Sequence, residues 1–343
     1  MNKLLTIVIP TYNVEKYLER CLDTLVYNED IQKYLEIIIV NDGSTDNSLK
    51  IAREYEKKYE SIKVLDKENG GHGSTINAGL KVATGKYFRV IDSDDWVNVI
   101  DFKKFILDLK DIDCDAIITN FSREYVYNNT SKKYKYSKQI EYNKIYNLSN
   151  FDLSKFNDDY FYMATTSYKT EILKKNNILL DENMFYVDME YVIFPFAYIN
   201  NFILLDYDIY RYFIGRPDQS VNIKSFVKNR ANHEYVLKKL INYYSSIELS
   251  KNKMDYIKKI LILMANTHYI IYCKSGLLKR KNVKEIRFFD KYLKRANIDL
   301  YNAVGNKFTY IRWNRKTKFV FSITKKCRFS RLADRFAKRK GNL

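Results

Sequence analysis

The apolar residues of the first part of the chain form short continuous runs separated by segments with helical spacing. Leu35 to Val40 is a nearly continuous apolar run, which is typical of a parallel strand covered on both faces. Similar runs predict strands at Leu4 to Pro10, Ile62 to Leu65 and Tyr87 to Ile91. Glu15 to Tyr27 has its leucines at the spacing of an amphipathic helix. Strand and helix alternate four times in about ninety residues, which predicts an α/β domain with a mostly parallel central sheet flanked by helices.

Polar or glycine-containing turns follow these four predicted strands. In open parallel sheets, ligands bind beyond the carboxyl ends of the strands. Tyr12, Asp42, Gly71 and Asp94 all fall in such turns. We therefore expect a binding site at that edge of the sheet.

Three carboxylates follow the fourth predicted strand, in the run Asp92-Ser93-Asp94-Asp95. Like charges this close repel one another and raise each other's pKa. A divalent cation removes that cost, and hard ions such as Mg²⁺ or Mn²⁺ prefer oxygen ligands. The run predicts a metal site. The alternative is a solvated acidic turn that caps a helix starting near Asp101.

The glycine-rich stretch Gly71-His72-Gly73 begins like a dinucleotide-binding fingerprint. The third glycine of that fingerprint is missing, and no Walker G-K-S/T sequence follows. We therefore expect neither a dinucleotide nor ATP at this position. A loop whose backbone amides lie near a phosphate or a sugar is the interpretation that the glycines still allow.

The pattern changes after the strand predicted at Ala116 to Asn120, and further strands are predicted at Phe161 to Ser167 and Phe202 to Leu205. Residues 123–147 are rich in Tyr, Lys and Asn, which predicts exposed strands or a hairpin lining a cleft. Stacking on nucleic acid is an alternative for such a segment, but residues 101–220 carry 18 Asp+Glu against 15 Lys+Arg. Asp188-Met189-Glu190 stands directly before an apolar helix predicted at Tyr191 to Ile199, so Asp188 could simply cap that helix.

Composition narrows the class of protein. Of the 343 residues, 46% are hydrophobic and 15% aromatic, as in folded globular proteins. No apolar run reaches the ~18 to 20 residues of a transmembrane helix, and no signal peptide is indicated, so we expect a cytoplasmic protein. The 4 cysteines lack C-x-x-C spacing and the 3 histidines are scattered, which indicates neither disulfides nor a zinc site.

The net charge of +18 is concentrated at one end. Residues 221–343 carry 31 Lys+Arg against 7 Asp+Glu, a net of +24. Helical patterns cover roughly 224–244, 253–275 and 282–296, so we predict a helical, basic C-terminal region. Because this region shows no zinc-finger ligand spacing and no RNP-type motif, we do not expect nucleic acid as a partner.

The end of the chain has the pattern of a basic amphipathic helix. Its apolar residues recur at helical spacing among Lys and Arg: Phe329, Leu332, Ala333, Phe336 and Ala337. Such a helix can lie on an anionic membrane surface, with Trp313, Phe319 and Phe321 as interfacial anchors. Packing of its apolar face on the catalytic domain is an equal alternative. The first interpretation would place the protein peripherally at the inner face of the cell membrane.

Four motifs together resemble a known family. They are V-I-P-T-Y-N at Val8–Asn13, V-N-D-G-S-T-D at Val40–Asp46, E-N-G-G-H-G-S-T-I-N-A-G at Glu68–Gly79, and the D-S-D-D run. This set is similar to the family 2 nucleotide-sugar glycosyltransferases of GT-A fold that act in bacterial polysaccharide synthesis. The resemblance covers about residues 3–120 and extends more weakly to about 220. Two positions depart from the common pattern, Asn41 where many members have Asp and Val187 where many have Glu.

The resemblance implies a Rossmann-like catalytic domain at 1–220, with a nucleotide-sugar half at about 1–120 and an acceptor half at about 121–220, followed by the region 221–343. It implies an inverting transfer of a sugar from a nucleoside diphosphate sugar, UDP-sugar in the first instance, to a hydroxyl of a glycan or lipid-linked acceptor. The implied cofactor is Mn²⁺ or Mg²⁺.

The resemblance also implies roles for individual residues. Asp94 would bind the metal directly, with Asp92 as a ribose or metal partner and Asp95 nearby. Asp42 would accept a hydrogen bond from a pyrimidine N–H. Asp188 would be the general base, with Glu190 as the second candidate. The remaining residues expected to border the nucleotide are Thr11, Tyr12, Asn13 and Gly71.

Three other classes of protein were weighed. A non-catalytic sugar- or nucleotide-binding relative would be expected to lose the metal aspartates, which are present here. A basic nucleic-acid-binding protein would fit the charge but has no supporting motif. A sugar nucleotidylyltransferase would need a glycine-rich nucleotide loop after the first strand, and Pro10-Thr11-Tyr12-Asn13 is not one.

Overall fold

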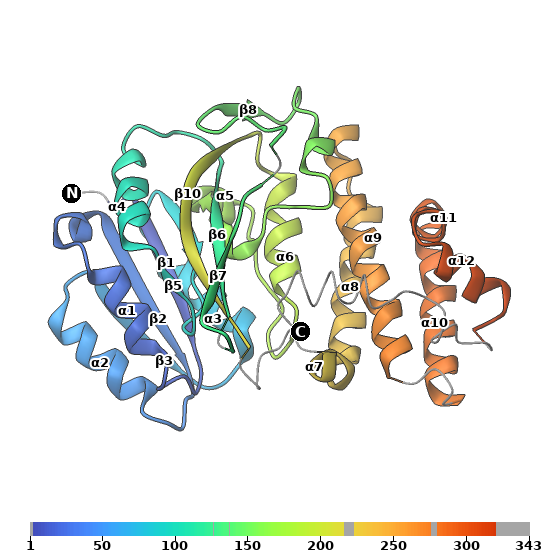
Figure 1. Ribbon diagram of the computed structural model, residues 1–343, viewed down its shortest axis with the longest axis horizontal. Helices are drawn as coiled ribbons and strands as arrows, with labels where there is room; N and C mark the ends of the chain where they lie inside the picture. The colour runs from blue at the N-terminus through green and yellow to red at the C-terminus, as the bar shows by residue number, and fades with distance from the viewer. Residues whose placement is uncertain (1–2, 126, 137, 216–222, 276–279, 320–343) are drawn as a thin grey trace. The chain divides into compact units, whose positions relative to one another are not determined.

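The computed structural model describes residues 3–319 apart from 126, 137, 216–222 and 276–279 (Figure 1). It divides into two units, Met1–Phe213 and Ile214–Leu343. The predicted division of the first unit into a donor half and an acceptor half stays a prediction.

Four parallel strands form the first part of the sheet. β1 (Leu5–Thr11), β2 (Leu35–Asp42), β3 (Ile62–Lys67) and β4 (Tyr87–Val90) lie in the order β3-β2-β1-β4. Every residue of β1 and β2 is buried, which explains why their sequences lack alternation. The α/β class predicted from this pattern is confirmed.

The rest of the sheet joins by antiparallel pairing. β9 (Thr166–Lys169) pairs with β4 and with β6 (Ala116–Tyr125), and β7 (Thr130–Tyr134) pairs with β6. The long strand β10 (Asn201–Ile214) pairs with β5 (Trp96–Val97) and β8 (Ile145–Asn147). The sheet order is β3-β2-β1-β4-β9-β6-β10-β5. The predicted parallel arrangement therefore holds for β1 to β4, whereas the connection between β6 and β7 is too short for the crossover that parallel strands need.

Helices cover both faces of the parallel strands (Figure 1). α1 (Leu18–Val26), α2 (Ser48–Lys58) and α4 (Val99–Asp108) share one apolar core with Leu5, Ile7 and Ile9. α3 (Gly71–Val82) packs on the other face, so closely that a Cβ on Gly79 would lie 2.4 Å from Val8. The shorter helical segments of this unit are η1 (Glu29–Tyr34), η2 (Leu153–Phe156), η3 (Met163–Thr165), α5 (Thr170–Lys175), α6 (Asp188–Ile193) and η4 (Pro195–Ala197).

Two sequence predictions in the second half of this unit differ from the structure. The strand predicted at Phe161 to Ser167 begins only at Thr166, after the turn η3. The helix predicted to run to Ile199 ends at Ile193, because Pro195 cannot continue its hydrogen-bonding pattern. Residues 123–147 do form strands at β6, β7 and β8, and most of β7 is exposed.

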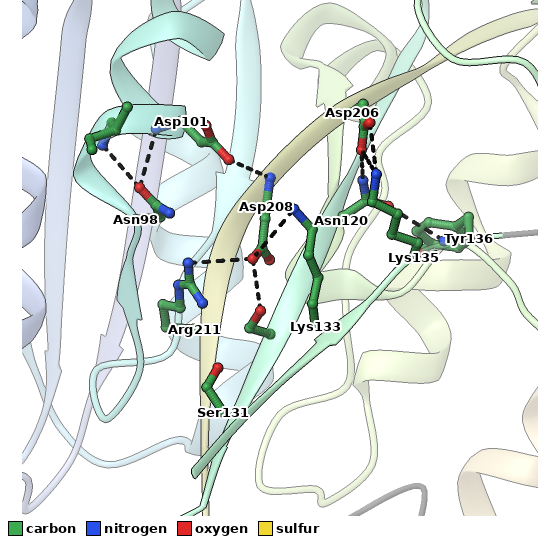
Figure 2. A network of polar contacts seen from close by, with 12 residues as sticks. Asn98, Asp101, Asn120, Ser131, Lys133, Lys135, Tyr136, Asp206, Asp208 and Arg211 are labelled. Carbon is green, nitrogen blue, oxygen red and sulfur yellow. Dashed lines mark hydrogen bonds and ion pairs between the residues drawn. The ribbon is translucent and has the colours of Figure 1, made fainter. Parts of the chain in front are cut away.

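A network of polar contacts fixes β10 to its neighbours (Figure 2). Buried Asp208 accepts a hydrogen bond from Ser122 Oγ at 2.8 Å and lies 3.3 Å from Arg211 and 3.8 Å from Lys133. Its backbone N–H donates to Asp101 Oδ2 on α4 at 2.9 Å. These contacts join β6, β7 and α4 to one residue of β10, which holds that strand in register.

The described residues of the second unit form helices: α7 (Ile223–Lys228), α8 (Arg230–Ser246), α9 (Lys251–Lys274), α10 (Arg280–Ala296), α11 (Ile298–Lys307) and α12 (Thr309–Lys316). His233 on α8 stacks on His268 on α9, with the two Nδ1 atoms 3.2 Å apart. Arg315 on α12 pairs with Asp290 on α10 at 2.7 Å. The predicted helical C-terminal region is confirmed.

The predicted membrane-binding segment is only partly described. Phe321 and the apolar residues from Phe329 to Ala337 lie outside the described residues. Trp313 is 38% exposed, whereas Phe319 is buried and stacks on Tyr269, so the structure does not present Phe319 as an anchor. Among the helices described, none has the length and apolarity to cross a membrane.

Candidate functional site

The acidic run follows β4 directly, at the carboxyl edge of the parallel strands. Asp92 and Asp94 are partly exposed, whereas Asp95 is buried. Asp95 accepts hydrogen bonds from the hydroxyl of Tyr210 at 2.5 Å and from the backbone N–H of Phe213 at 2.7 Å. Burial, together with the charges of Asp94 and Asp92, raises the pKa of Asp95 well above its ordinary value. The carboxylate of Asp95 thus attaches the acidic run to β10, and a role as metal ligand stays a prediction.

An arginine on α1 supports the backbone of the same run. Arg20 donates a hydrogen bond from Nη2 to the carbonyl oxygen of Asp94 at 2.9 Å. Its guanidinium lies 3.8 Å from the ring centre of Trp96 and 4.2 Å from that of Phe213. A planar cation that packs against two aromatic rings is held by cation–π contacts, so Arg20 fixes the position of the Asp94 backbone.

His72 lies where the carboxylates converge. Its Nε2 is 3.0 Å from Asp92 Oδ1. Partial burial lowers the pKa of His72, but the hydrogen bond to Asp92 and the negative charges of Asp92, Asp188 and Asp94 raise it above the ordinary value overall. An electrostatic effect of this kind requires the charges to be close. The charge of Asp188 on α6 therefore acts on the same histidine as the charges of the acidic run.

The predicted nucleotide-binding residues near β1 have different environments. Tyr12 is 51% exposed, whereas Thr11 is buried at the end of β1. Asn13 adopts a positive φ of 51° and accepts a hydrogen bond from the backbone N–H of Thr45 at 2.8 Å. The ring of Tyr12 is therefore exposed, and Asn13 joins the turn after β1 to the turn after β2.

Asp42 holds the glycine-rich turn. Its carboxylate accepts hydrogen bonds from the backbone N–H groups of Gly70 and Gly71, both at 2.8 Å, and from Lys67 Nζ at 2.9 Å. Asp42 is only 3% exposed. A pyrimidine N–H would have to share these oxygens, so recognition of the base by Asp42 stays a prediction. Gly71 has a φ of 80°, a conformation that favours glycine.

The two candidates for the general base stand in different environments. Asp188 is partly exposed and begins α6. Its charge acts on Tyr160 as well as on His72, since burial and then the charge of Asp188 raise the pKa of Tyr160. Glu190 is fully buried and accepts a hydrogen bond from the backbone N–H of Asp181 at 2.8 Å. Of the two, Asp188 is the one whose charge acts on His72 beside the acidic run.

The carboxylates of the acidic run could bind a cation only together with a bound substrate. Within the described parts of the chain, no three or more His, Cys, Asp or Glu side chains form a group that could hold a metal ion. Carboxylates such as those of Asp92 and Asp94 are suitable ligands for hard ions, and Mg²⁺ is commonly held by one or two of them plus substrate phosphates. The residues therefore fit an ion shared with a diphosphate.

Sequence reasoning did not identify three residues of this site. Arg20 and Tyr210 lie in segments without a motif, and their importance comes from packing between distant elements. His72 stands inside a glycine-rich stretch that was examined only for its glycines. A histidine followed twenty positions later by the acidic run was the signal that could have drawn attention to it.

Comparison with known sequences shows which protein family the first half of the chain matches. Residues 6–176 match the model of glycosyl transferase family 2. The chain is 30% identical over 217 residues to the uncharacterized glycosyltransferase EpsJ of Bacillus subtilis, covering 62% of this chain and 61% of EpsJ. It is 43% identical over 95 residues to the poly(ribitol-phosphate) beta-glucosyltransferase of Bacillus spizizenii, covering 27% and 15% of the two chains. The matches thus span less than two thirds of these relatives.

Comparison with solved structures concerns the fold. The crystal structure of S. aureus TarS 1–349 in complex with UDP superposes with a TM-score of 0.67 at 20% identity, covering 99% of this chain and 92% of the other. The mannosyltransferase PcManGT of Pyrobaculum calidifontis, in complex with GDP-Man and Mn²⁺, gives a TM-score of 0.52 at 12% identity over 90% and 88%. The α/β architecture with its curled sheet and flanking helices is the GT-A fold. The chain belongs to glycosyl transferase family 2.

Proposed function

We propose that this protein transfers a sugar from a UDP-sugar to a hydroxyl group of a glycan or lipid-linked acceptor, with inversion at the anomeric carbon, in the synthesis of a cell-surface polymer. The observation that carries the proposal is the contact of His72 with Asp92 directly after β4, together with the charges of Asp94 and Asp188, which act on the same histidine. These residues would supply carboxylates for two roles, one that stabilises the leaving group and one that activates the acceptor.

The relatives support the choice of donor and of product. TarS has been crystallised with UDP and with UDP-GlcNAc. The Bacillus spizizenii relative acts on poly(ribitol-phosphate). A UDP-sugar and a surface polymer are therefore the first candidates for this chain.

The acidic run would serve the leaving group. A departing diphosphate gathers negative charge in the transition state, and a bound Mn²⁺ or Mg²⁺ would stabilise it as a Lewis acid. Asp94 and Asp92 are the residues we assign to that ion, and the Mn²⁺ in the PcManGT complex supports the choice of metal. Asp95 and Arg20 both hold the run in place. The exposed ring of Tyr12 would stack on the nucleobase, next to Thr11 and Asn13.

Asp188 would serve the acceptor. The attacking hydroxyl must lose its proton as the new bond forms, and a placed carboxylate contributes roughly 10²–10⁴-fold as general base. Asp188 would take that proton on the side of the sugar opposite the diphosphate. This arrangement inverts the anomeric carbon.

A panel of nucleotide sugars tests the proposal. The full chain would be incubated with Mn²⁺ and each UDP- and GDP-sugar, with and without lipid-linked acceptors, and release of the nucleoside diphosphate measured. We expect acceptor-dependent release from one UDP-sugar, and its loss in Asp94→Asn. No release, together with no calorimetric binding of any nucleotide sugar, would contradict the proposal.

A further inference from the structure

Residues Leu180 to Asn183, here called the strap, lie directly on the glycine-rich turn Gly70 to Gly73. The backbone N–H of Asn183 donates a hydrogen bond to the carbonyl oxygen of Gly70 at 2.5 Å. A Cβ on Gly73 would lie 2.1 Å from the carbonyl oxygen of Asp181, and one on Gly71 would lie 3.2 Å from the backbone nitrogen of Asn183. The glycines therefore let two backbones approach closely, so their local task is to seat the strap.

Asn77 on α3 holds the start of the strap. Its amide Nδ2 donates to the carbonyl oxygen of Leu180 at 2.8 Å, and its Oδ1 accepts from the backbone N–H of Leu180 at 2.9 Å. One side chain thus satisfies both backbone groups of one strap residue. This paired contact fixes the position and the direction of the strap relative to α3.

Glu190 on α6 holds the strap from its other side. Its buried Oε2 accepts the backbone N–H of Asp181. Asp188 and Glu190 are two positions apart on a short helix, so they point to different sides of it. Glu190 thereby links the strap to the helix whose first residue is Asp188.

The other side of the glycine-rich turn leads to the acidic run. Gly70 and Gly71 donate to Asp42, and His72, the next residue, contacts Asp92. The strap, the turn and the acidic run therefore form one continuous set of contacts from α6 to the end of β4.

We infer that Asn77 and Glu190 are positioning residues that place Asp188 by holding the strap on the glycine-rich turn. The inference rests on the proposed function, because it assigns these residues to the transfer step. It gives Glu190 a structural task as a hydrogen-bond acceptor. Because a misplacement of about 1 Å can lower a rate about 10²-fold, the strap contacts matter for transfer without touching either substrate.

Substitutions at Glu190 distinguish a role as hydrogen-bond acceptor from a role as general base. Gln keeps an oxygen that accepts the N–H of Asp181 but is not basic. We expect Glu190→Gln to transfer at close to the wild-type rate and Glu190→Ala to lose at least about tenfold in kcat. Equal large losses in both variants, with unchanged stability, would show that Glu190 acts through its charge and overturn the inference.

A double-mutant cycle tests whether Asn77 acts through Asp188. We expect Asn77→Ala to lower kcat for transfer about tenfold or more and to leave the affinity for the UDP-sugar with Mn²⁺ unchanged. In an Asp188→Asn background the same substitution should have no further effect, because the group it positions is already gone. Lys81→Ala, an exposed position on the same helix, is the matched control. A loss at Asn77 that multiplies with that of Asp188→Asn would overturn the inference.

Hydrogen exchange tests the seating of the strap independently of catalysis. In Asn77→Ala, amides of residues 180–184 should exchange faster than in Lys81→Ala and the wild type. Unchanged exchange would overturn the inference even if the proposed function holds. If the wild type turned over no nucleotide sugar, the proposed function would fail by itself, and this measurement would still decide whether Asn77 holds the strap.

Discussion

The hydroxyl group of Tyr210 joins Asp95 to β10. It donates a hydrogen bond to Asp95 Oδ2 and accepts one from the backbone N–H of Asp92 at 3.3 Å. Tyr210 lies on β10, whereas the two aspartates follow β4. The position of the acidic run therefore depends on a strand that is distant from it in the sequence.

Tyr210→Phe is expected to weaken metal binding as well as the fold. The variant leaves the buried carboxylate of Asp95 without one of its donors, which costs about 1–3 kcal/mol of the free energy of unfolding. Calorimetry should also show weaker binding of Mn²⁺ with UDP. Tyr207→Phe removes a hydroxyl on the same strand that donates a hydrogen bond to Asp108. This control should lower the free energy of unfolding but leave the binding of Mn²⁺ with UDP unchanged. Equal Mn²⁺–UDP affinity in both variants would contradict this prediction.

Asp188→Asn is expected to lower turnover at least about a hundredfold, the lower range for loss of a general base. Donor affinity should barely change, because Asp188 is assigned to the acceptor. Steady-state transfer and calorimetry of UDP-sugar binding measure the two quantities. A loss confined to donor affinity would remove Asp188 from the role of base.

The two aspartates on β10 should differ in their effect on stability. Asp208 is buried among Ser122, Arg211 and Lys133 (Figure 2), so Asp208→Ala leaves buried donors unsatisfied and should lower the free energy of unfolding by about 1–3 kcal/mol. Asp206 pairs with Lys135 at a site where its side chain is 41% exposed. Asp206 also accepts a hydrogen bond from Nδ2 of buried Asn120 at 2.9 Å, so the control is Asp206→Asn, which keeps an oxygen for that bond and removes only the charge of the exposed pair. It should cost about 0–1 kcal/mol. Urea denaturation compares them, and equal losses would argue against the network.

The helical C-terminal unit should lose stability as the pH falls below about 6.5. Burial lowers the pKa of His268 although Glu234 raises it, and a histidine in the unfolded chain has a pKa of about 6.5. The unfolded state then binds more protons, so the free energy of unfolding falls with falling pH. The groups facing His268 are His233 on α8 and, on the same helix as His233, Glu234, which also pairs with Lys238.

Glu234 adds to this dependence at lower pH. Burial raises the pKa of Glu234, but hydrogen bonds from His268 and Lys238 lower it overall to about 2. Its contribution is lost as the pH falls from about 4.3 toward 2.

Hydrogen exchange of α9, corrected for intrinsic rates, should show wild-type protection decreasing from pH 7.5 to 5.5 and a smaller decrease in His268→Gln. Identical pH profiles would remove His268 as the cause.

Deletion of residues 324–343 tests the predicted membrane contact. The segment carries many Lys and Arg residues, and each basic residue near an anionic lipid surface contributes roughly 1 kcal/mol. The truncated chain should bind anionic liposomes less than the full chain and transfer more slowly to a lipid-linked acceptor, with donor hydrolysis spared. Equal liposome binding at low and moderate salt would exclude this segment as the anchor.

The parallel part of the sheet and the residues at its carboxyl edge could be predicted from the sequence. Continuous apolar runs such as Leu35 to Val40 have few alternatives to a buried parallel strand, and the acidic run follows its strand directly. Alternation of strand and helix therefore predicts Asp42, Gly71 and Asp94 at one edge of the sheet.

The rest depends on contacts between residues far apart in the chain. Tyr210 and Asp95 are separated by 115 positions, and Asn77 and Leu180 by 103. No pattern of neighbouring residues in the sequence indicates either contact, since both depend on how the antiparallel part of the first unit packs on its parallel part. The predicted end of α6 is wrong for a simpler reason: apolar periodicity continues to Ile199, whereas Pro195 lacks the backbone N–H that a longer helix would need.

The close approach of Gly73 to Asp181 has a consequence for exchanging parts between members of this family. A chimera that exchanges the acceptor half predicted at about 121–220 would be cut near residue 120. Such a cut separates the glycine-rich turn from the strap, and any side chain larger than hydrogen at position 73 would displace the backbone at 181. Segments 70–77 and 180–190 should therefore be transferred together, as a single recombination block.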